Sequence, residues 1–327
     1  MTTSETPTST VPQAVPPLKP GRVIEGISAV LLPFTAQDTP DWESFRRLLD
    51  RTWTAGLTPA VNMDTGYVHL LTAEERGRVL AETQEVARGR RFVAGAFIEG
   101  EDGDPAALYT GEVDRIRQRG GTPIIFQCSA IARATDAQVA DLYARIGETG
   151  GPLLAFELGT MFAPFGRIYS DDLVGRLLGI EAFVGLKHSS LARTIEWTRL
   201  AIRDRVRPDF RIYTGNDLAI DMVFYGSDYL LGLSAFAVDG FAARDRLWAA
   251  GDARAVGLND LLQYLGQLAF RRPVPAYKHS AAQFLKNRGL IATDRPHPRS
   301  PRRPDADVAV LQDIAERLDD TLARLGS

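Results

Sequence analysis

The sequence has one cysteine and four histidines among 327 residues, and this scarcity limits its chemistry. A lone Cys128 excludes an intramolecular disulfide framework and any site built on several cysteines. The histidines are scattered, without the HxH or HExxH spacing of common zinc sites. We therefore expect no metal and no other cofactor. Weak support for a reducing, cytoplasmic location comes from the same single cysteine.

Long apolar runs and an excess of one charge are also missing. No stretch approaches the roughly 18 apolar residues of a membrane span. The formal net charge is -3, with no long basic stripe, so we expect neither a membrane nor a nucleic-acid partner. Residues 1–22 are rich in Thr, Ser and Pro and lack the apolar core of a signal peptide. We expect a disordered tail there.

After this tail, short β-prone apolar runs alternate with amphipathic stretches. Nearly continuous apolar runs are typical of parallel strands that are buried on both faces. The helical stretches carry end signals, such as the capping box of Thr72 and Glu75. The eight apolar runs are residues 27–34, 58–64, 91–98, 122–129, 152–159, 183–190, 210–217 and 229–236.

Eight such units predict an α/β fold, a (β/α)8 barrel over residues 23–238. The alternative is a doubly wound open sheet, but neither GxGxxG nor GxxxxGK[ST] is present to support a nucleotide-binding version of it. Residues 239–327 read as consecutive helices and predict a C-terminal helical subdomain packed on the barrel. Within it, the Pro- and Arg-rich residues 295–303 are expected to form a solvated connector.

The barrel prediction indicates which polar residues are candidates for an active site, because active sites of such barrels lie at the C-terminal ends of the strands. Lys187 falls near the end of the sixth strand. A desolvated lysine amine is partly neutral and can attack a ketone to form a Schiff base. Position alone leaves two other roles open: an ion pair with Glu157 or Asp217, and a lysine that reaches solvent.

The stretch FVGLKHSS (183–190) resembles the lysine strand of the dihydrodipicolinate synthase and N-acetylneuraminate lyase family. Further segments are similar to motifs of that family: GISAVLLPF, AGLTPAVNMDTGYVHLLTAEER, YTGND and PVPAYKHSAAQFLKNRG. The family consists of Schiff-base aldolases and lyases that act on pyruvate and related 2-oxo acids. The resemblance implies the barrel with its helical subdomain, and a homo-oligomer, either a tetramer or a dimer.

The resemblance also implies roles for individual residues. Lys187 matches the Schiff-base lysine, and Asp64, Thr65 and Gly66 match the loop that holds the substrate carboxylate. Asn216 and Asp217 follow the seventh strand, where Asp217 would orient Lys187 or cap the next helix.

The sequence departs from the family at several of these positions. Asp64 replaces a threonine, and its charge would repel a substrate carboxylate unless it points elsewhere, is protonated or binds another group. Phe156 replaces the tyrosine that usually shuttles protons, Tyr67 replaces a glutamate, and Ile131 lies near another expected tyrosine. These losses argue against the lysine-biosynthetic reaction, 4-hydroxy-tetrahydrodipicolinate synthesis.

Another group must then move protons. Glu157, Tyr169 and Asp64 are the candidates; for the first two the alternatives are an ion pair and a contact that fixes the loop. Arg167 would hold a second substrate carboxylate or lie at the surface. His69 is a weaker acid–base candidate.

Two further residues beside these motifs are expected to be structural. His188 is expected to face away from the site, and Cys128 to be a small buried hydrophobe.

These observations favour a lyase or aldolase that acts on pyruvate or a related 2-oxo acid through Lys187. The alternatives are a dehydratase of a 2-oxo-3-deoxy sugar acid that uses the same imine, and a catalytically silent ligand-binding protein.

Overall fold

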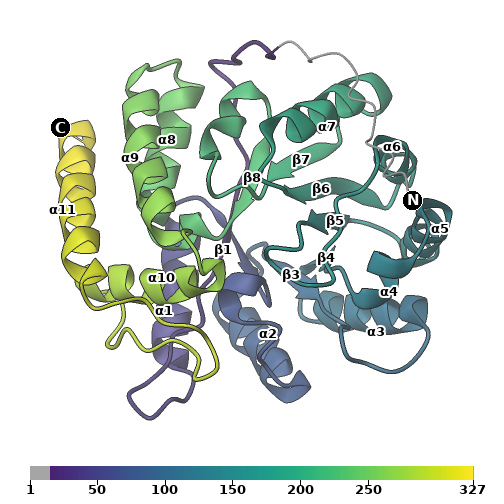
Figure 1. Ribbon diagram of the computed structural model, residues 1–327, viewed down its shortest axis with the longest axis horizontal. Coiled ribbons are helices and arrows are strands. Elements are labelled where there is room, and N and C mark those ends of the chain that lie inside the picture. The colour runs from purple at the N-terminus through teal and green to yellow at the C-terminus, as the bar shows by residue number, and fades with distance from the viewer. Residues whose placement is uncertain (1–14, 327) are drawn as a thin grey trace, which may run out of the picture.

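Eight parallel strands close into a barrel in the computed structural model, which describes residues 15–326. They lie in sequence order, and β1 pairs with β8 to close the sheet (Figure 1). Each predicted apolar run overlaps one strand, so the predicted (β/α)8 barrel is confirmed. The strands are β1 Gly26–Ala29, β2 Thr58–Val61, β3 Val93–Ala96, β4 Thr122–Ile125, β5 Leu153–Leu158, β6 Phe183–Ser189, β7 Arg211–Thr214 and β8 Asp228–Leu231.

Helices follow the strands and surround the barrel. Asp41 caps the first of them by accepting from the Ser44 N–H, and the capping box of Thr72 and Glu75 is present. The α-helices are α1 Trp42–Thr54, α2 Ala73–Ala87, α3 Pro105–Gln118, α4 Ser129–Arg133, α5 Asp136–Gly147, α6 Asp171–Leu178, α7 Arg193–Val206, α8 Val238–Ala249, α9 Arg254–Ala269, α10 Tyr277–Asn287 and α11 Asp307–Gly326. The 3-10 helices are η1 Asp64–Gly66, η2 Ile220–Tyr225, η3 Leu233–Ala235 and η4 Val274–Ala276.

One predicted helix has a different form. The stretch between β7 and β8 is the 3-10 helix η2 rather than an α-helix, and it ends at Gly226 with a φ of 119°. Short connections favour the tighter 3-10 turn, and glycine adopts this φ without a Cβ clash.

Apolar side chains form two layers, one inside the barrel and one between the strands and the helices. The interior layer includes Ile124, Phe126, Phe156 and Leu230, while the outer layer includes most of the helix-facing leucines and valines. Because strand residues alternate between the two layers, the phase of each strand decides which side chains reach the barrel interior.

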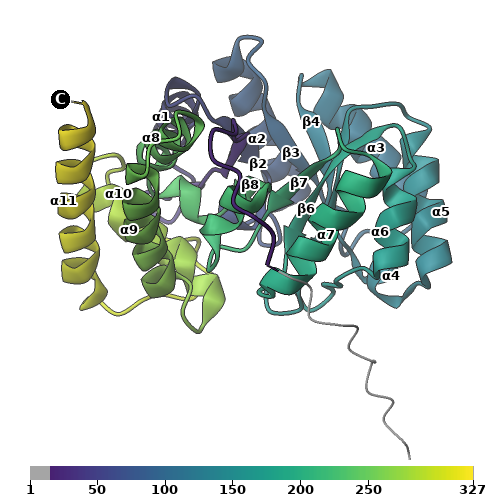
Figure 2. The same ribbon diagram turned by 90° about the horizontal axis from the view of Figure 1, so that it is seen from above.

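The C-terminal helices gather on one side of the barrel. Figures 1 and 2 show α9, α10 and α11 together there. The sequence analysis assigned helix α8 to the C-terminal subdomain that begins at residue 239. In the structure α8 directly follows β8 and packs against β1 and α1 as well as α9. It therefore occupies the position of the eighth barrel helix.

The connector before α11 is packed rather than solvated, contrary to expectation. His297 is buried, and its ring lies 5.3 Å from that of Phe34. The buried Arg303 guanidinium donates to the carbonyls of Ala269 (2.8 Å) and Arg272 (3.2 Å). These bonds from the two terminal nitrogens offset part of the cost of burying the guanidinium. The connector thereby ties the C-terminal helices to the loops after β1 and β2.

The N-terminal segment before β1 packs against the ends of η2 and α8. The Lys19 N–H donates to the Phe224 carbonyl (2.8 Å), and the Gly21 N–H donates to the Trp248 carbonyl (3.0 Å). Residues 1–14 of the predicted tail lie outside the described residues.

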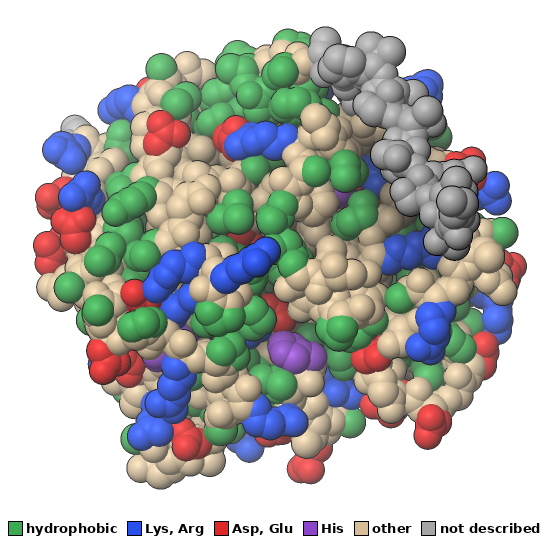
Figure 3. All heavy atoms as spheres, viewed as in Figure 1, with side chains coloured by type: hydrophobic (Ala, Val, Ile, Leu, Met, Phe, Trp, Pro, Cys, Tyr) green, Lys and Arg blue, Asp and Glu red, His purple; other side chains and the backbone are tan. Residues whose placement is uncertain are grey.

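The face of the molecule in Figure 3 mixes basic and acidic side chains without a large patch of either sign. Among residues 15–326, the structure contains no helix long and apolar enough to cross a membrane.

Gly95 in β3 provides a test of the packing. A Cβ there would overlap the backbone carbonyl oxygen of Asn62, which cannot yield without moving β2. We expect Gly95→Ala to lower the free energy of unfolding by about 2 kcal/mol. The control is Gly77→Ala in α2, which meets nothing within 4 Å and should gain up to about 1 kcal/mol from helix propensity. Equal stabilities in urea denaturation would contradict this packing.

Candidate active site

Lys187 reaches into the mouth of the barrel from the C-terminal half of β6. Its side chain is 9% exposed, and its Nζ donates to the Ser189 Oγ at 2.6 Å. The amine also lies 4.1 Å from the ring centroid of Phe156 on the neighbouring strand β5. Gly215 makes room for this arrangement, because a Cβ at that position would lie 2.9 Å from Nζ.

Burial controls the charge of this amine. Desolvation lowers the pKa of Lys187 to about 8, although the carboxylates of Asp217 and Asp64 oppose the change. Burial likewise raises the pKa of Asp217 to about 7, against the Leu233 N–H that donates to its Oδ1 at 2.7 Å and against Lys187. The charge of each group therefore influences the titration of the other.

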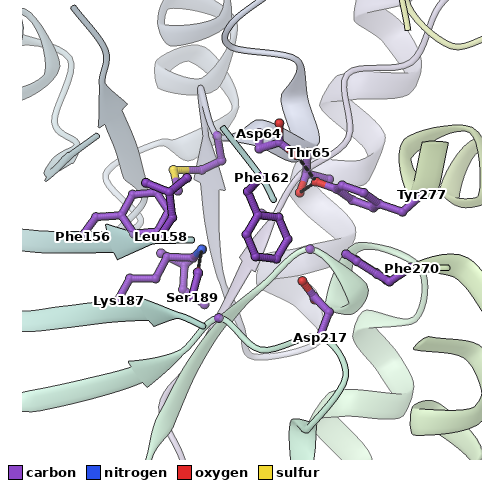
Figure 4. Close-up of a pocket in the computed structure, with 15 residues that line it drawn as sticks. Asp64, Thr65, Phe156, Leu158, Phe162, Lys187, Ser189, Asp217, Phe270 and Tyr277 are labelled. Atoms are coloured by element: carbon purple, nitrogen blue, oxygen red, sulfur yellow. Dashed lines mark hydrogen bonds between the residues drawn. The ribbon is translucent and has the colours of Figure 1, made fainter. Parts of the chain in front are cut away.

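The cavity around Lys187 is small and has mixed walls (Figure 4). Its volume is about 40 Å³, enough for roughly three waters. Polar groups come from η1 after β2, from β6, from the loop after β7 and from α10. Its lining consists of Ala29, Met63, Asp64, Thr65, Phe156, Leu158, Phe162, Lys187, Ser189, Gly215, Asp217, Leu230, Gly232, Phe270 and Tyr277.

The predicted carboxylate loop is the 3-10 turn η1 at the end of β2. Thr65 lines the cavity, and Gly66 is buried behind it, where a Cβ would lie 3.3 Å from the Val30 carbonyl oxygen. The Gly66 N–H makes the first hydrogen bond of the turn, to the Met63 carbonyl at 3.0 Å. The preceding N–H groups of Asp64 and Thr65 have no acceptor within the turn, as at any helix start.

Asp64 meets cationic and hydroxyl partners, which resolves the repulsion expected from its charge. Its carboxylate accepts from the Lys278 Nζ (3.0 Å) and the Tyr277 hydroxyl (2.8 Å), and the His69 Nδ1 lies at 3.3 Å. Burial alone would raise the pKa of Asp64, but Lys278, His69 and Tyr277 together lower it. Asp64 is therefore ionised and neutralised locally.

Glu157 lies in the outer layer, away from the cavity, contrary to the relay role suggested by sequence. Its carboxylate lies 2.6 Å from the His188 Nδ1 and accepts from the Arg199 Nε (2.9 Å) and the Tyr169 N–H (2.6 Å). Burial would raise the pKa of Glu157, but His188 and Arg199 outweigh it and lower the pKa to about 2. This placement argues for the ion-pair alternative.

Tyr169, Arg167 and Asn216 also lie outside the cavity lining. The Tyr169 hydroxyl lies 3.0 Å from that of Tyr143, which fixes the loop after β5. Arg167 is held by the Ala134 carbonyl and Asp136, so it does not present its charge to the cavity. Asn216 uses its Oδ1 for a local turn with the Leu218 N–H (3.1 Å).

The residues expected to be structural are buried outside the cavity lining. His188 faces away from Lys187, as the alternation of β6 requires, and its Nε2 lies 2.7 Å from the Ser190 Oγ. Cys128 is a free, buried thiol.

Sequence reasoning gave no role to several residues in or beside this site. Ser189 could have been found, because it lies two residues after Lys187 on the same face of a strand. Phe162 comes from the loop after β5 and Phe270 follows α9, and no local pattern indicates either of them. Tyr277 and Lys278 lie in the motif PVPAYKHSAAQFLKNRG, which does not show that they contact Asp64.

Within residues 15–326 no group of three or more His, Cys, Asp and Glu side chains is arranged to hold a metal ion.

The buried Glu157–Arg199 pair should matter for stability. Glu157→Gln leaves Arg199 without its main counter-charge, so we expect the free energy of unfolding at neutral pH to fall by about 3 kcal/mol. Since the pKa of Glu157 is lowered in the fold, this contribution is present above the ordinary carboxyl pKa. It should be lost as the pH falls from about 5 toward 2.

The control is Glu43→Gln, which removes the exposed partner of Arg47 and should cost under about 1 kcal/mol. Urea titrations at several pH values compare the variants. A Glu157→Gln protein as stable as the control would contradict the structural role.

Comparison with known proteins gives different results for sequence and structure. No protein-family model and no curated protein matches the sequence. Solved structures do match. The prophage protein YagE from E. coli K12, of the dihydrodipicolinic acid synthase family and in complex with pyruvate, aligns with a TM-score of 0.78 at 17% identity. That alignment covers 90% of this chain and 98% of YagE.

Two dihydrodipicolinate synthases give similar values. The enzyme from Thermotoga maritima has a TM-score of 0.77 at 16% identity, with 91% of this chain and 99% of that one covered. The chloride-inhibited enzyme from Acinetobacter baumannii, complexed with pyruvate, has a TM-score of 0.71 at 20% identity, with coverages of 93% and 99%. At these identities the likeness establishes a shared fold, and with it the fold that the sequence motifs implied.

Proposed function

We propose that the protein is a divergent member of the dihydrodipicolinate synthase and N-acetylneuraminate lyase superfamily, a Schiff-base lyase or aldolase acting on pyruvate or a related 2-oxo acid through Lys187. One observation carries the proposal: a buried lysine amine with a lowered pKa lies in a cavity at the C-terminal end of a barrel strand. Solved structures of the same fold include two that are complexed with pyruvate. The proposal includes a homo-oligomer, a dimer or a tetramer.

The residues of the cavity support each step of imine formation. Burial lowers the pKa of Lys187 to about 8 against the charge of Asp217, so part of the amine is neutral near neutral pH. The neutral amine attacks the ketone carbon, and loss of water gives an imine that withdraws electrons from the neighbouring carbon. In this proposal Thr65, which lines the cavity, and the N–H groups that open η1 hold the substrate carboxylate.

The basic side chains that line the cavity limit which 2-oxo acids can bind. Lys187 is the one basic side chain among the lining residues, and Arg167 is engaged elsewhere. A second substrate carboxylate would therefore meet no arginine in the cavity. Together with Phe156 in place of the usual tyrosine, this argues against 4-hydroxy-tetrahydrodipicolinate synthase as the activity.

Reductive trapping tests the imine directly. The chain has four lysines, Lys19, Lys187, Lys278 and Lys286, so a labelled residue is easily mapped. We expect pyruvate plus borohydride to add one reduced pyruvyl group to the wild-type protein. The label should be absent from Lys187→Ala and intact in Lys286→Ala, because Lys286 is a half-exposed surface lysine. Intact-mass and peptide mass spectrometry measure both.

The outcomes separate the candidate functions. A labelled protein that releases water from a 2-oxo-3-deoxy sugar acid, without carbon–carbon cleavage, is the dehydratase. A protein that binds 2-oxo acids without labelling is the silent binding protein, and that result would overturn the proposal.

The pH dependence of trapping follows from the lowered pKa of Lys187. Since the neutral amine reacts, the trapping rate should rise with pH and level off above about 8, whereas an ordinary lysine would keep rising to about 10. Asp217→Asn removes the charge that raises the pKa of Lys187, so the midpoint should move to lower pH. A midpoint near 10, or a shift upward in Asp217→Asn, would argue against the pair.

A further inference from the structure

A chain of hydroxyl and carboxyl groups lines the side of the cavity opposite Phe156. Figure 4 shows Thr65 and Tyr277 meeting there, across the cavity from Lys187. The Tyr277 hydroxyl lies 2.9 Å from the Thr65 Oγ1 and donates to the Asp64 Oδ2 at 2.8 Å. His69, whose side chain is 38% exposed, lies 3.3 Å from the other oxygen of Asp64. The groups thus run without a gap from the cavity to the surface.

The charges in this chain suit proton transfer. Burial, and then the neighbouring Asp64, raise the pKa of Tyr277 well above 10, so the phenol holds its proton. Asp64 is ionised, because Lys278 helps to lower its pKa. Burial also lowers the pKa of His69, against the charge of Asp64, so its ring can accept a proton and release it to water. A donor therefore faces an acceptor at each contact.

The position of Tyr277 is fixed by packing rather than by the substrate. Its ring stacks on Phe270 with centroids 4.3 Å apart and planes at 16°. The Lys278 Nζ lies 5.1 Å from the same ring and is bonded to Asp64. A phenol held in this way needs no reorganisation before it transfers a proton.

We infer that Tyr277, supported by Asp64, is the proton-transfer group of this site and performs from α10 the task for which β5 has no tyrosine. This inference rests on the proposed imine at Lys187. When the C3–H bond of the bound pyruvate imine breaks, its electron pair forms the C2=C3 bond of the enamine and neutralises the iminium nitrogen. The C3 proton goes to the Tyr277 oxygen as Tyr277 passes its own proton to Asp64, and His69 returns that proton to water.

Hydrogen exchange at the pyruvate methyl group tests the inference on the full-length protein. In D₂O the reversible step replaces methyl hydrogens by deuterium, which NMR follows, while borohydride trapping measures the imine at equilibrium. We expect Tyr277→Phe to keep the imine fraction and to lower the exchange rate per trapped imine at least about 100-fold. Asp64→Asn, which accepts a hydrogen bond but not a proton, should also slow exchange.

The control is Tyr143→Phe, which removes another buried phenol, outside the cavity lining. It should leave exchange unchanged. Melting curves show that each variant is folded. A general disturbance of the site would lower the imine fraction and the exchange rate together, whereas loss of the transfer group lowers exchange alone.

The outcomes for this inference and for the proposed function differ. Equal exchange per imine in the wild type and Tyr277→Phe would overturn the role of Tyr277 and leave the Lys187 imine standing. Absence of any imine in the wild-type protein would overturn both.

Discussion

The cost of removing a lysine amine from water governs the arrangement of the site. Because side chains of β6 alternate between the barrel interior and the helix layer, Lys187 points into the barrel mouth and is only 9% exposed, so its charge must be compensated where it lies. Compensation is partial: a hydroxyl at 2.6 Å, an aromatic ring and two carboxylates surround the amine, and its pKa still falls to about 8. A more complete ion pair would have kept the amine protonated and unreactive.

Strands β5 and β6 carry structural residues on their outer face and cavity-lining residues on their inner face. In register, Phe156 pairs with Lys187 inside the barrel, and Glu157 pairs with His188 outside it. The outer pair belongs to a fully buried network anchored by Arg199. Adjacent residues on one strand therefore have different roles. Those on the outer face hold the strands and helices together, and those on the inner face line the cavity. A shift of one residue in register would exchange the two sets.

The sequence predicted the strands, their closure and the lysine, because these depend on local periodicity and on segments that are continuous along the chain. It did not fix the phase of the strands, so Glu157 appeared to be a proton carrier although it faces the helices. The partners of Asp64 were also beyond reach, since Tyr277 and Lys278 lie more than two hundred residues away and are placed by the packing of α10. A charge that looked unfavourable in a short motif is balanced by a helix that the motif does not contain.

The position of Tyr277 has a stereochemical consequence. An enamine bound to Lys187 is planar and has two faces. In the inferred reaction, a phenol on α10 would approach the enamine from the side of the cavity opposite Phe156, where β5 has no tyrosine. Hydrogen delivered from that side would create the mirror-image configuration at a prochiral carbon. Moving one hydroxyl from a strand to a helix could thus reverse the handedness of the product while the same lysine and the same imine are kept.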